Sequence, residues 1–441
     1  MSMRPLKNPF ILVTSLFMSA FIFSCDDKCE TTYTYISYEP VYVTLPSIRN
    51  DVSVRSAESI GTPGKIYIYD HFIFVNEVSK GIHVIDNSDP QAPVNISFIN
   101  IPGNFDLAVS NNYLYADSYV DLLVFDISNP AGIQQVNRIN SVFEDLYPYT
   151  VTPDGANAII AKYEEKEMQI VHNDCEGIVP AFLKGNGGAQ FYLATPHSAD
   201  VALNAASPAS VPSGSNTGTG GSLARFAIVN DVLYTVGTNR MNVFDIYDPG
   251  SPVSLSTVEI GWGIETVFPY KNNLFIGAQN GMHIFNVSEP TSPQYISTFS
   301  HVNSCDPVVV NDSLAFVTLR SGNACQGFSN ELDIIDIKNL YNPVLLTTYS
   351  MLSPYGLGLD GQTLFICEGT NGLKVFNSDN IYALNSGLVK FYSDISAYDV
   401  IPINKDLILI GDDGLYQFDY SNLDDIKLLS RISVTPDSGN E

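Results

Sequence analysis

The sequence predicts an all-β fold made of repeated four-stranded units, and three observations support this. Short apolar runs of about five residues alternate with turn residues and show no helical period. One such unit, clearest from Leu223 to Gly261, recurs along most of the 441-residue chain. Its period of about 40 residues is typical of the blades of a β-propeller.

Each unit is predicted to hold four short strands. In the clearest copy these are residues 225–229, 232–236, 241–245 and 253–260. Asn, Asp, Gly and Pro residues separate them, and these residue types favour tight turns. The unit is therefore predicted to form an antiparallel meander.

The third strand aligns the copies, because each is an apolar pentapeptide that mostly ends in Asp or Asn. The copies begin at Ile82, Leu122, Met168, Met241, Met282, Leu332, Leu373 and Leu415. Successive starts are 40, 46, 73, 41, 50, 41 and 42 residues apart, so the two longest gaps must hold insertions. We expect about eight blades, with seven as the alternative if the copy ending at His172 does not form a full blade.

These pentapeptides resemble the LVIVD repeat, a propeller-forming repeat of bacterial secreted and surface proteins. The sequences that close them support the resemblance: Asn87–Pro90, Ile127–Pro130, Ile246–Pro249 and Val287–Pro290. The resemblance implies one propeller over residues 64–434 and says almost nothing about function. Two copies depart most from the pattern: the one that ends in His172 and the one that contains Gln417.

The chain begins with features of a secretion signal. Arg4 and Lys7 precede an apolar run at residues 10–23 that is short for a membrane span. The run ends before Cys25 in a sequence that resembles a bacterial lipobox, which implies lipidation of Cys25; the alternative is an ordinary signal peptide with Cys25 in a disulfide. The acidic residues 26–30 resemble the surface-export signal of Bacteroidetes-type lipoproteins, or form a solvated tether. We expect an outer membrane lipoprotein exposed at the cell surface and held to the membrane by its lipid anchor.

The predicted organisation has five parts. Residues 1–24 are the lipoprotein signal peptide, and residues 25–63 are a tether with an extra strand segment. Residues 64–434 are the propeller, which contains a flexible Gly/Ser-rich insertion at 184–222. Residues 435–441 are a C-terminal tail.

The formal net charge of −26 argues against binding to nucleic acid or anionic lipid headgroups through charge and permits cation binding. Glu164, Glu165 and Glu167 are either oxygen ligands for calcium or a charged hairpin tip. No spaced calcium-binding motif occurs, so no cofactor or metal site is predicted, and bound calcium stays open.

The cysteines and histidines do not form a recognisable catalytic or zinc-binding set. Secretion makes disulfides possible, and Cys305 and Cys325 are candidates for a pair within one blade. Cys367 lies in an apolar strand and is expected to be a free buried thiol. His83 and His283 occupy equivalent positions in two copies and are interpreted as peripheral. No Ser/His/Asp triad can be assembled.

The first strand of each propeller blade lines the central axis, so the residues that open these strands are the candidate ligand site. They are Asp106, Tyr149, Arg225, Glu265, Asp306, Tyr355 and Tyr398. Carboxylates with one Arg and several Tyr suit a glycan, a peptide or a cation. The alternative is that these groups bond to one another and to ordered water.

Two classes of function follow from the sequence. The first is a non-catalytic surface scaffold that binds a partner protein or a glycan. The second is an extracytoplasmic hydrolase or lyase that uses carboxylates at the channel. The anchor, the repeat and the absence of a nucleophile constellation favour the first, although the fold alone does not decide between them.

Overall fold

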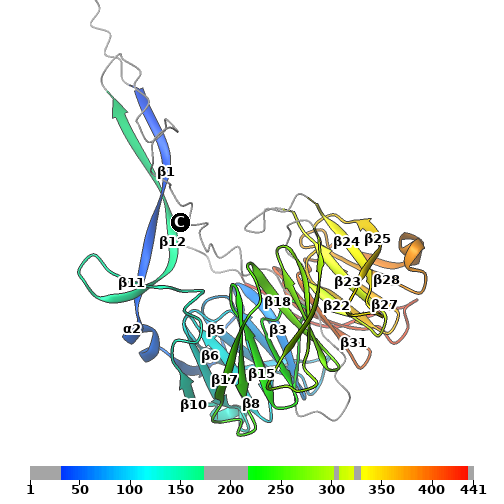
Figure 1. Ribbon diagram of the computed structural model, residues 1–441, viewed down its shortest axis with the longest axis horizontal. Coiled ribbons are helices and arrows are strands. Elements are labelled where there is room, and N and C mark those ends of the chain that lie inside the picture. Colours follow the sequence, from blue (N-terminus) through cyan, green and yellow to red (C-terminus); the bar gives the residue numbers. More distant parts are fainter. Residues whose placement is uncertain (1–30, 173–216, 302–306, 322–328, 436–441) are drawn as a thin grey trace, which may run out of the picture. The chain divides into compact units, whose positions relative to one another are not determined.

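The computed structural model describes residues 31–172, 217–301, 307–321 and 329–435. These residues form eight antiparallel sheets, of which six are four-stranded, one is six-stranded and one is three-stranded (Figure 1). Helix is confined to α2 (Leu45–Asn50) and the short 3-10 turns η1 (Pro130–Gly132) and η4 (Ile381–Gly387) within this part of the chain. None of the described helices is long and apolar enough to cross a bilayer. The all-β prediction is confirmed.

Seven sheets contain a meander of four consecutive strands, and we call them blades 1 to 7. Blade 1 has β3 (Pro63–Tyr69), β4 (Phe72–Glu77), β5 (Gly81–Asp86) and β6 (Val94–Asn100); blade 2 has β7 (Leu107–Ser110), β8 (Tyr113–Ser118), β9 (Asp121–Asp126) and β10 (Gln134–Ile139). Blade 3 has β14 (Phe226–Val229), β15 (Val232–Val236), β16 (Arg240–Asp245) and β17 (Val253–Glu259); blade 4 has β18 (Ile264–Tyr270), β19 (Asn273–Ala278), β20 (Gly281–Asn286) and β21 (Gln294–Ser300). Blade 5 has β22 (Val308–Val310), β23 (Leu314–Leu319), β24 (Glu331–Asp336) and β25 (Val344–Ser350); blade 6 has β26 (Leu357–Asp360), β27 (Thr363–Cys367), β28 (Leu373–Asn377) and β29 (Leu388–Tyr392). Blade 7 has β30 (Asp399–Ile403), β31 (Asp406–Gly411), β32 (Gly414–Asp419) and β33 (Lys427–Ser433).

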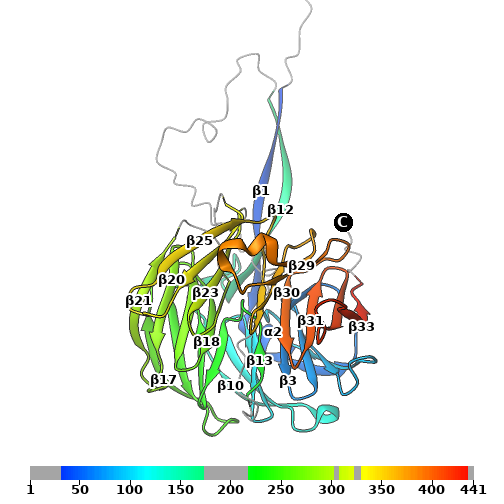
Figure 2. The ribbon, with the colours of Figure 1, turned by 90° about the vertical axis from the view of Figure 1, so that its right-hand side faces the viewer.

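The first strands of successive blades lie against one another around a common axis. Each strand contacts the next in the order β3, β7, β14, β18, β22, β26 and β30. Both β30 and β31 then contact β3, which closes the ring. Figure 2 shows blade 7 beside β3 of blade 1. The prediction of a β-propeller of four-stranded blades is confirmed, and these blades correspond to the alternative count of seven.

The closing Asp or Asn of each third strand has a structural role in all seven blades. Its side-chain oxygen accepts a hydrogen bond of 2.8–3.1 Å from the backbone amide two residues later. The residues are Asp86, Asp126, Asp245, Asn286, Asp336, Asn377 and Asp419. This Asx turn redirects the chain toward the fourth strand, which explains why the repeat ends as it does.

The same turn joins neighbouring blades. A hydroxyl group of one blade donates a hydrogen bond of 2.5–2.9 Å to a backbone carbonyl in the turn of the next blade. The pairs are Tyr115 with Pro249, Tyr234 with Pro290, Ser297 with Leu340, Tyr349 with Ile381 and Ser430 with Pro90. The last pair joins blade 7 to blade 1.

The sequence copy that ends in His172 does not form a blade. Its residues lie in β11 (Tyr149–Val151) and the 16-residue β12 (Asn157–His172), which share a three-stranded sheet with β1 (Thr31–Thr44). No Gly, Asn, Asp or Pro lies between Ala158 and Val171, so no turn divides this stretch into two strands. The repeat spacing alone did not reveal that two expected strands form one long strand here.

The chain divides into two compact units, residues 1–39 with 164–194 and the remainder. In the first unit, the described parts of β1 and β12 are neighbouring strands, and Lys166 pairs with Glu39 at 3.1 Å. In the second unit, α2 packs beside blade 2, where Arg49 binds Asp121 at 2.8 Å. The strand predicted before the first blade is present as β1, and β2 (Ser53–Ser56) extends the outer edge of blade 1 beside β6.

Blades 1 and 7 join without sharing a strand. Their inner strands form one apolar cluster, which contains Ile66 of β3, Ile408 of β31 and Val434 after β33. The backbone amide of Thr435 also donates to the carbonyl of Ile60 at 2.7 Å. Side-chain packing and single hydrogen bonds therefore hold the first blade to the last.

Candidate functional site

The structure places the predicted channel residues in different surroundings. Asp106, Arg225 and Tyr398 directly precede first strands. Tyr355 lies two residues before β26, and Glu265 lies at the start of β18. Each blade has four strands that alternate in direction, so the first strands of all blades run the same way. The residues at their beginnings therefore lie on the same side of the ring. Asp306 lies outside the described residues.

Tyr149 does not belong to this group, which corrects the sequence prediction. It lies on β11 in the three-stranded sheet, where its side chain is 42% exposed. Its hydroxyl lies 2.5 Å from that of Ser141. The error follows from treating this part of the chain as a blade.

Asp106 is buried and already bonded on several sides. Its carboxylate accepts hydrogen bonds from Lys65 Nζ at 2.5 Å, from the Leu107 amide at 2.7 Å, and from the Arg225 amide. Burial lowers the pKa of Lys65, and the nearby Asp106 carboxylate opposes that shift. The carboxylate therefore joins blades 1, 2 and 3 and is not free to bind a ligand.

A second buried carboxylate supports the first. Asp117 Oδ1 accepts the amides of Phe105 and Asp106 at 2.8 and 2.9 Å, and the Asn104 side chain at 2.8 Å. Burial raises the pKa of Asp117 to about 6 despite these hydrogen bonds. The arrangement fixes the chain before β7.

Tyr355 and Tyr398 form an aromatic group between blades 5, 6 and 7. Their rings meet edge to face with centroids 4.8 Å apart, and the guanidinium of Arg320 lies 4.0 Å from the Tyr355 centroid. The Tyr398 hydroxyl donates to Asp412. Burial, together with this carboxylate, raises the pKa of Tyr398.

The chain itself occupies the axis of the ring. Residues 217–225, which we call the axial segment, cross between the inner strands. Thr217 bridges to Ser110 of β7, and β13 (Thr219–Gly220) pairs with β3. The carbonyl of Ala224 accepts from the Val267 amide of β18 at 2.7 Å, and Ser222 Oγ lies 3.4 Å from the Leu357 amide of β26. The segment thus contacts blades 1, 2, 4 and 6.

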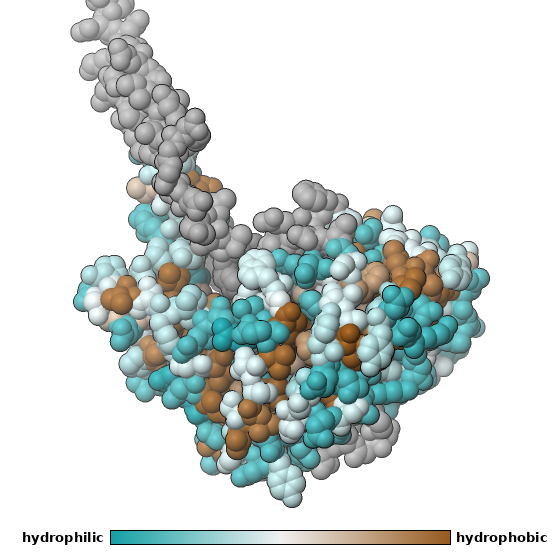
Figure 3. Space-filling view, in the orientation of Figure 1, coloured by the Kyte–Doolittle hydropathy of each residue, from teal (hydrophilic) through white to brown (hydrophobic). Residues whose placement is uncertain are grey.

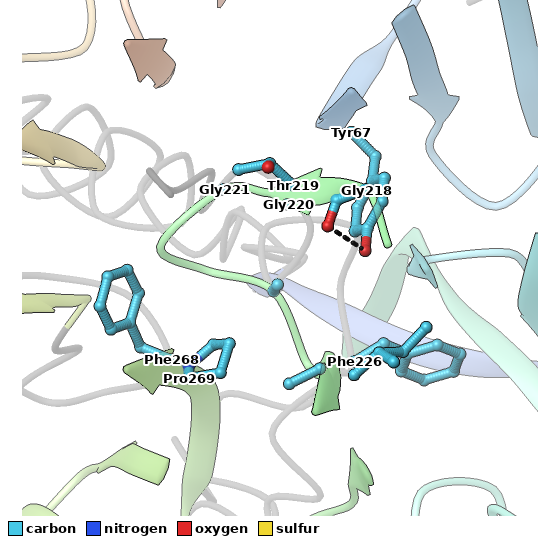
Figure 4. Close-up of a pocket in the computed structure, with 11 residues that line it drawn as sticks. Tyr67, Gly218, Thr219, Gly220, Gly221, Phe226, Phe268 and Pro269 are labelled. Carbon is cyan, nitrogen blue, oxygen red and sulfur yellow. Dashed lines mark hydrogen bonds between the residues drawn. The ribbon is translucent and has the colours of Figure 1, made fainter. Parts of the chain in front are cut away.

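The glycines of this segment let its backbone approach β3 closely, so the segment is packed against the blade. A Cβ on Gly218 would lie 2.4 Å from the Tyr67 ring and 2.6 Å from the Ile68 carbonyl oxygen. Figure 4 shows the Tyr67 hydroxyl directed at the Gly218 carbonyl, to which it donates at 3.0 Å. The predicted flexible insertion, residues 184–222, therefore ends in an ordered part at 217–222; residues 184–216 lie outside the described chain.

A small pocket lies between the axial segment and blades 3 and 4 (Figure 4). Glycine backbone forms one side, and Phe226, Phe268 and Pro269 contribute to the other. None of its lining residues carries a carboxylate, an imidazole or a thiol. The Tyr67 hydroxyl, which does line the pocket, donates to the Gly218 carbonyl.

The other predicted groups are dispersed. His83 and His283 are buried, which corrects their interpretation as peripheral. His83 lies in blade 1 with Nε2 3.1 Å from Glu77, and His283 lies in blade 4 with Nδ1 2.7 Å from the Thr298 hydroxyl. Glu164, Glu165 and Glu167 lie along β12, and no group of three potential metal ligands occurs within the described ranges. Cys367 is free and buried, as predicted; Cys25, Cys305 and Cys325 lie outside the described residues.

Glu77 is a buried carboxylate of blade 1 that stabilises the fold in its ionised form. Burial alone would raise its pKa, but hydrogen bonds from His83, Gly61 and Thr62 outweigh burial and lower the pKa to about 2. The ionised form therefore stabilises the fold above pH 4.5, and this contribution is lost as the pH falls toward 2.

We predict that Glu77→Gln destabilises the protein at pH 7 and that the difference from wild type shrinks as the pH falls from about 4.5 to about 2. Denaturant unfolding followed by circular dichroism at several pH values measures this difference. Glu39→Gln, on an exposed ion pair, is the control and should have little effect at any pH. A difference that stays constant or grows in acid would contradict the assignment.

Sequence reasoning missed Trp262, the only tryptophan of the chain. It precedes β18 on the same side of the ring as Glu265, and its side chain is 71% exposed. The sequence did contain an indication of this exposure. Trp262 lies between two glycines at a predicted junction between blades, where the core does not require an apolar residue.

Comparisons with known proteins agree with the repeat and go no further. The model of the LVIVD repeat matches residues 104–140, which span blade 2, and residues 321–351, which include the last two strands of blade 5. No curated protein sequence matches the chain.

Solved structures show only distant likeness. The computationally designed protein Ika8 is 9% identical over 86% of this chain and 91% of its own, with a TM-score of 0.47. Hsv2 of Kluyveromyces lactis is 10% identical over 85% and 100%, with a TM-score of 0.48, and Sqt1 of Saccharomyces cerevisiae is 10% identical over 90% and 100%, with a TM-score of 0.45. Likeness at this level carries no argument about function. The chain is a β-propeller that carries LVIVD repeats.

Proposed function

We propose that the protein is a non-catalytic binding scaffold, anchored at the bacterial cell surface through a lipid on Cys25. A rigid repeat fold suits a scaffold or binding role. The observation that carries the proposal is the axial segment, because it fills the position where a propeller enzyme would hold its substrate. The proposed partner is a protein or a glycan outside the cell.

The hydrogen bonds already made by the channel carboxylates support binding over catalysis. Asp106 is bonded to Lys65 and to two backbone amides, and Asp117 accepts two further amides. A general acid or base must reach the proton that it transfers. Both of these groups are instead committed to holding the fold. A hydrolase or lyase remains the alternative, with Glu265 as its carboxylate.

The anchored location rests on the sequence before residue 31. The apolar run at residues 10–23, the lipobox-like end at Cys25 and the acidic residues that follow support export and lipidation. The net charge of −26 makes direct electrostatic adsorption to anionic lipid unfavourable, so the attachment is assigned to the lipid alone.

We predict that protease added to intact cells cleaves the protein, and that Cys25→Ser releases it from the membrane fraction. Cys367→Ser is the matched control, because that thiol is buried in blade 6 and the variant should stay membrane-bound. Immunoblots of shaved cells and of fractionated cells report both results. Protection until the outer membrane is permeabilised would place the propeller in the periplasm, and retention of Cys25→Ser in the membrane would refute lipid anchoring.

A further inference from the structure

Trp262 is a highly exposed aromatic residue. Between Leu255 and Tyr295 it is the only exposed large hydrophobic side chain. In Figure 3, apolar side chains on the face in view are interspersed with hydrophilic ones. A stable interface with a protein partner would need a broad packed centre of apolar and aromatic residues. With no other exposed large apolar side chain between Leu255 and Tyr295, Trp262 fits a smaller, polar ligand.

The backbone around Trp262 is fixed on both sides. The Ile260 amide donates to the Asn239 carbonyl at 3.0 Å, and the Ile264 amide donates to the Thr238 carbonyl at 3.0 Å. On the other side, the Gln279 amide donates to the Gly263 carbonyl at 2.9 Å. The loop is thus bonded to the turns of blades 3 and 4, so a ligand that contacts Trp262 orders little additional backbone.

Both glycines beside Trp262 are required for this arrangement. Gly261 has a φ of 151° and Gly263 a φ of 76°, a region that other residues rarely adopt. A Cβ on Gly263 would also lie 2.9 Å from the side chain of Gln279. Any other residue at either position would be strained, so the two glycines allow the backbone shape that exposes the indole.

Polar groups lie next to the glycines that flank Trp262. The Gln279 side-chain amide lies 3.5 Å from Glu265 Oε1, so donor and acceptor atoms are adjacent. His283 lies beneath Gly261, with Nε2 3.7 Å from where a Cβ on that glycine would be. This imidazole is nine-tenths buried, and its Nε2 has no hydrogen-bond partner among the described atoms. A buried, unpaired nitrogen calls for a polar group from outside.

We propose that this loop is a subsite for a neutral glycan. One face of a sugar ring consists of C–H groups and stacks on the Trp262 indole, while hydroxyl groups bond to Gln279 and Glu265 and approach His283. The net charge of −26 and the nearby Glu265 disfavour anionic sugars. This inference rests on the proposed binding function and names the ligand class.

The single tryptophan supplies the measurement. With excitation beyond the tyrosine band, emission comes from Trp262 alone, so the full mature protein can be titrated with cellohexaose, laminarihexaose, xylohexaose and mannohexaose. We expect a saturable change in emission with at least one of them. Calorimetry should show that Trp262→Ala weakens binding about 30-fold and that Trp262→Phe retains most of it. Tyr247→Ala, which removes an even more exposed aromatic side chain, should bind normally.

The possible outcomes separate the two proposals. If no neutral oligosaccharide binds, or if Trp262→Ala binds normally, the glycan subsite is refuted while the scaffold function stands. If Trp262→Ala instead prevents capture of a defined protein partner, the occupant is a protein and the subsite is again refuted. If the bound oligosaccharide is cleaved and Glu265→Gln abolishes cleavage while binding persists, the non-catalytic function itself is refuted.

Discussion

Replacing Leu223 with alanine is expected to lower the free energy of unfolding by about 3 kcal/mol. Leu223 belongs to the axial segment, and only 3% of it is exposed. It lies in the same apolar cluster as Ile66 of blade 1 and Tyr398 of blade 7. The truncation would leave a cavity where the first and last blades meet, because strands of rigid blades cannot collapse into it.

Leu428→Ala is the matched control, since the same truncation on β33 affects a side chain that is 55% exposed. Denaturant midpoints followed by circular dichroism compare the two variants, and the control should shift the free energy by less than about 0.5 kcal/mol. Equal effects would show that the axial segment is not part of the core. A loss of cooperativity in Leu223→Ala alone would show that blades 1 and 7 separate first.

Replacing Glu368 with alanine is expected to cost about 3–5 kcal/mol. Glu368 is fully buried after β27, and its carboxylate accepts the amides of Leu352 and Ser353 at 2.9 and 2.7 Å. It also pairs with Lys374 Nζ at 2.5 Å. Alanine would leave a largely buried ammonium unpaired and two amides without their acceptor.

Two further variants separate these causes. Glu368→Gln keeps an acceptor for the amides while removing the charge, so it should cost less than Glu368→Ala. Asp425→Ala removes one partner of the ion pair with Lys427, in which both side chains are 65% exposed, and should change the unfolding free energy by less than about 1 kcal/mol. Thermal and denaturant unfolding measure all three. If Glu368→Ala resembled Asp425→Ala, the buried pair would have no role in stability.

The blades were predictable because their signals are local. Every third-strand pentapeptide except that at Met168 forms the third strand of a blade, and its closing Asp or Asn makes an Asx turn within two residues. The copy at Met168 has the apolar spacing but lacks the preceding turn. Its pairing with β1, more than a hundred residues earlier, depends on contacts that no local pattern contains.

The candidate site was less predictable for a related reason. A Gly-rich stretch is consistent both with a flexible loop and with backbone packed tightly against an aromatic ring, and Gly218 against Tyr67 is the second case. Asp106 directly precedes β7. Sequence alone could not show that the Arg225 amide would occupy its carboxylate. Trp262 was overlooked because its importance depends on exposure, which composition does not report.

The way in which blades 1 and 7 join has a consequence for biosynthesis. Each blade is continuous in sequence, so each can form as it leaves the ribosome. The ring, however, is complete only when Val434 and Thr435 reach Ile60, and these are among the last described residues. Until blade 7 has been synthesised, the inner strands of blade 1 lack their neighbour, and apolar side chains such as Ile66 face water. Ring closure therefore waits for the last blade, and until then the exposed blade surfaces favour aggregation.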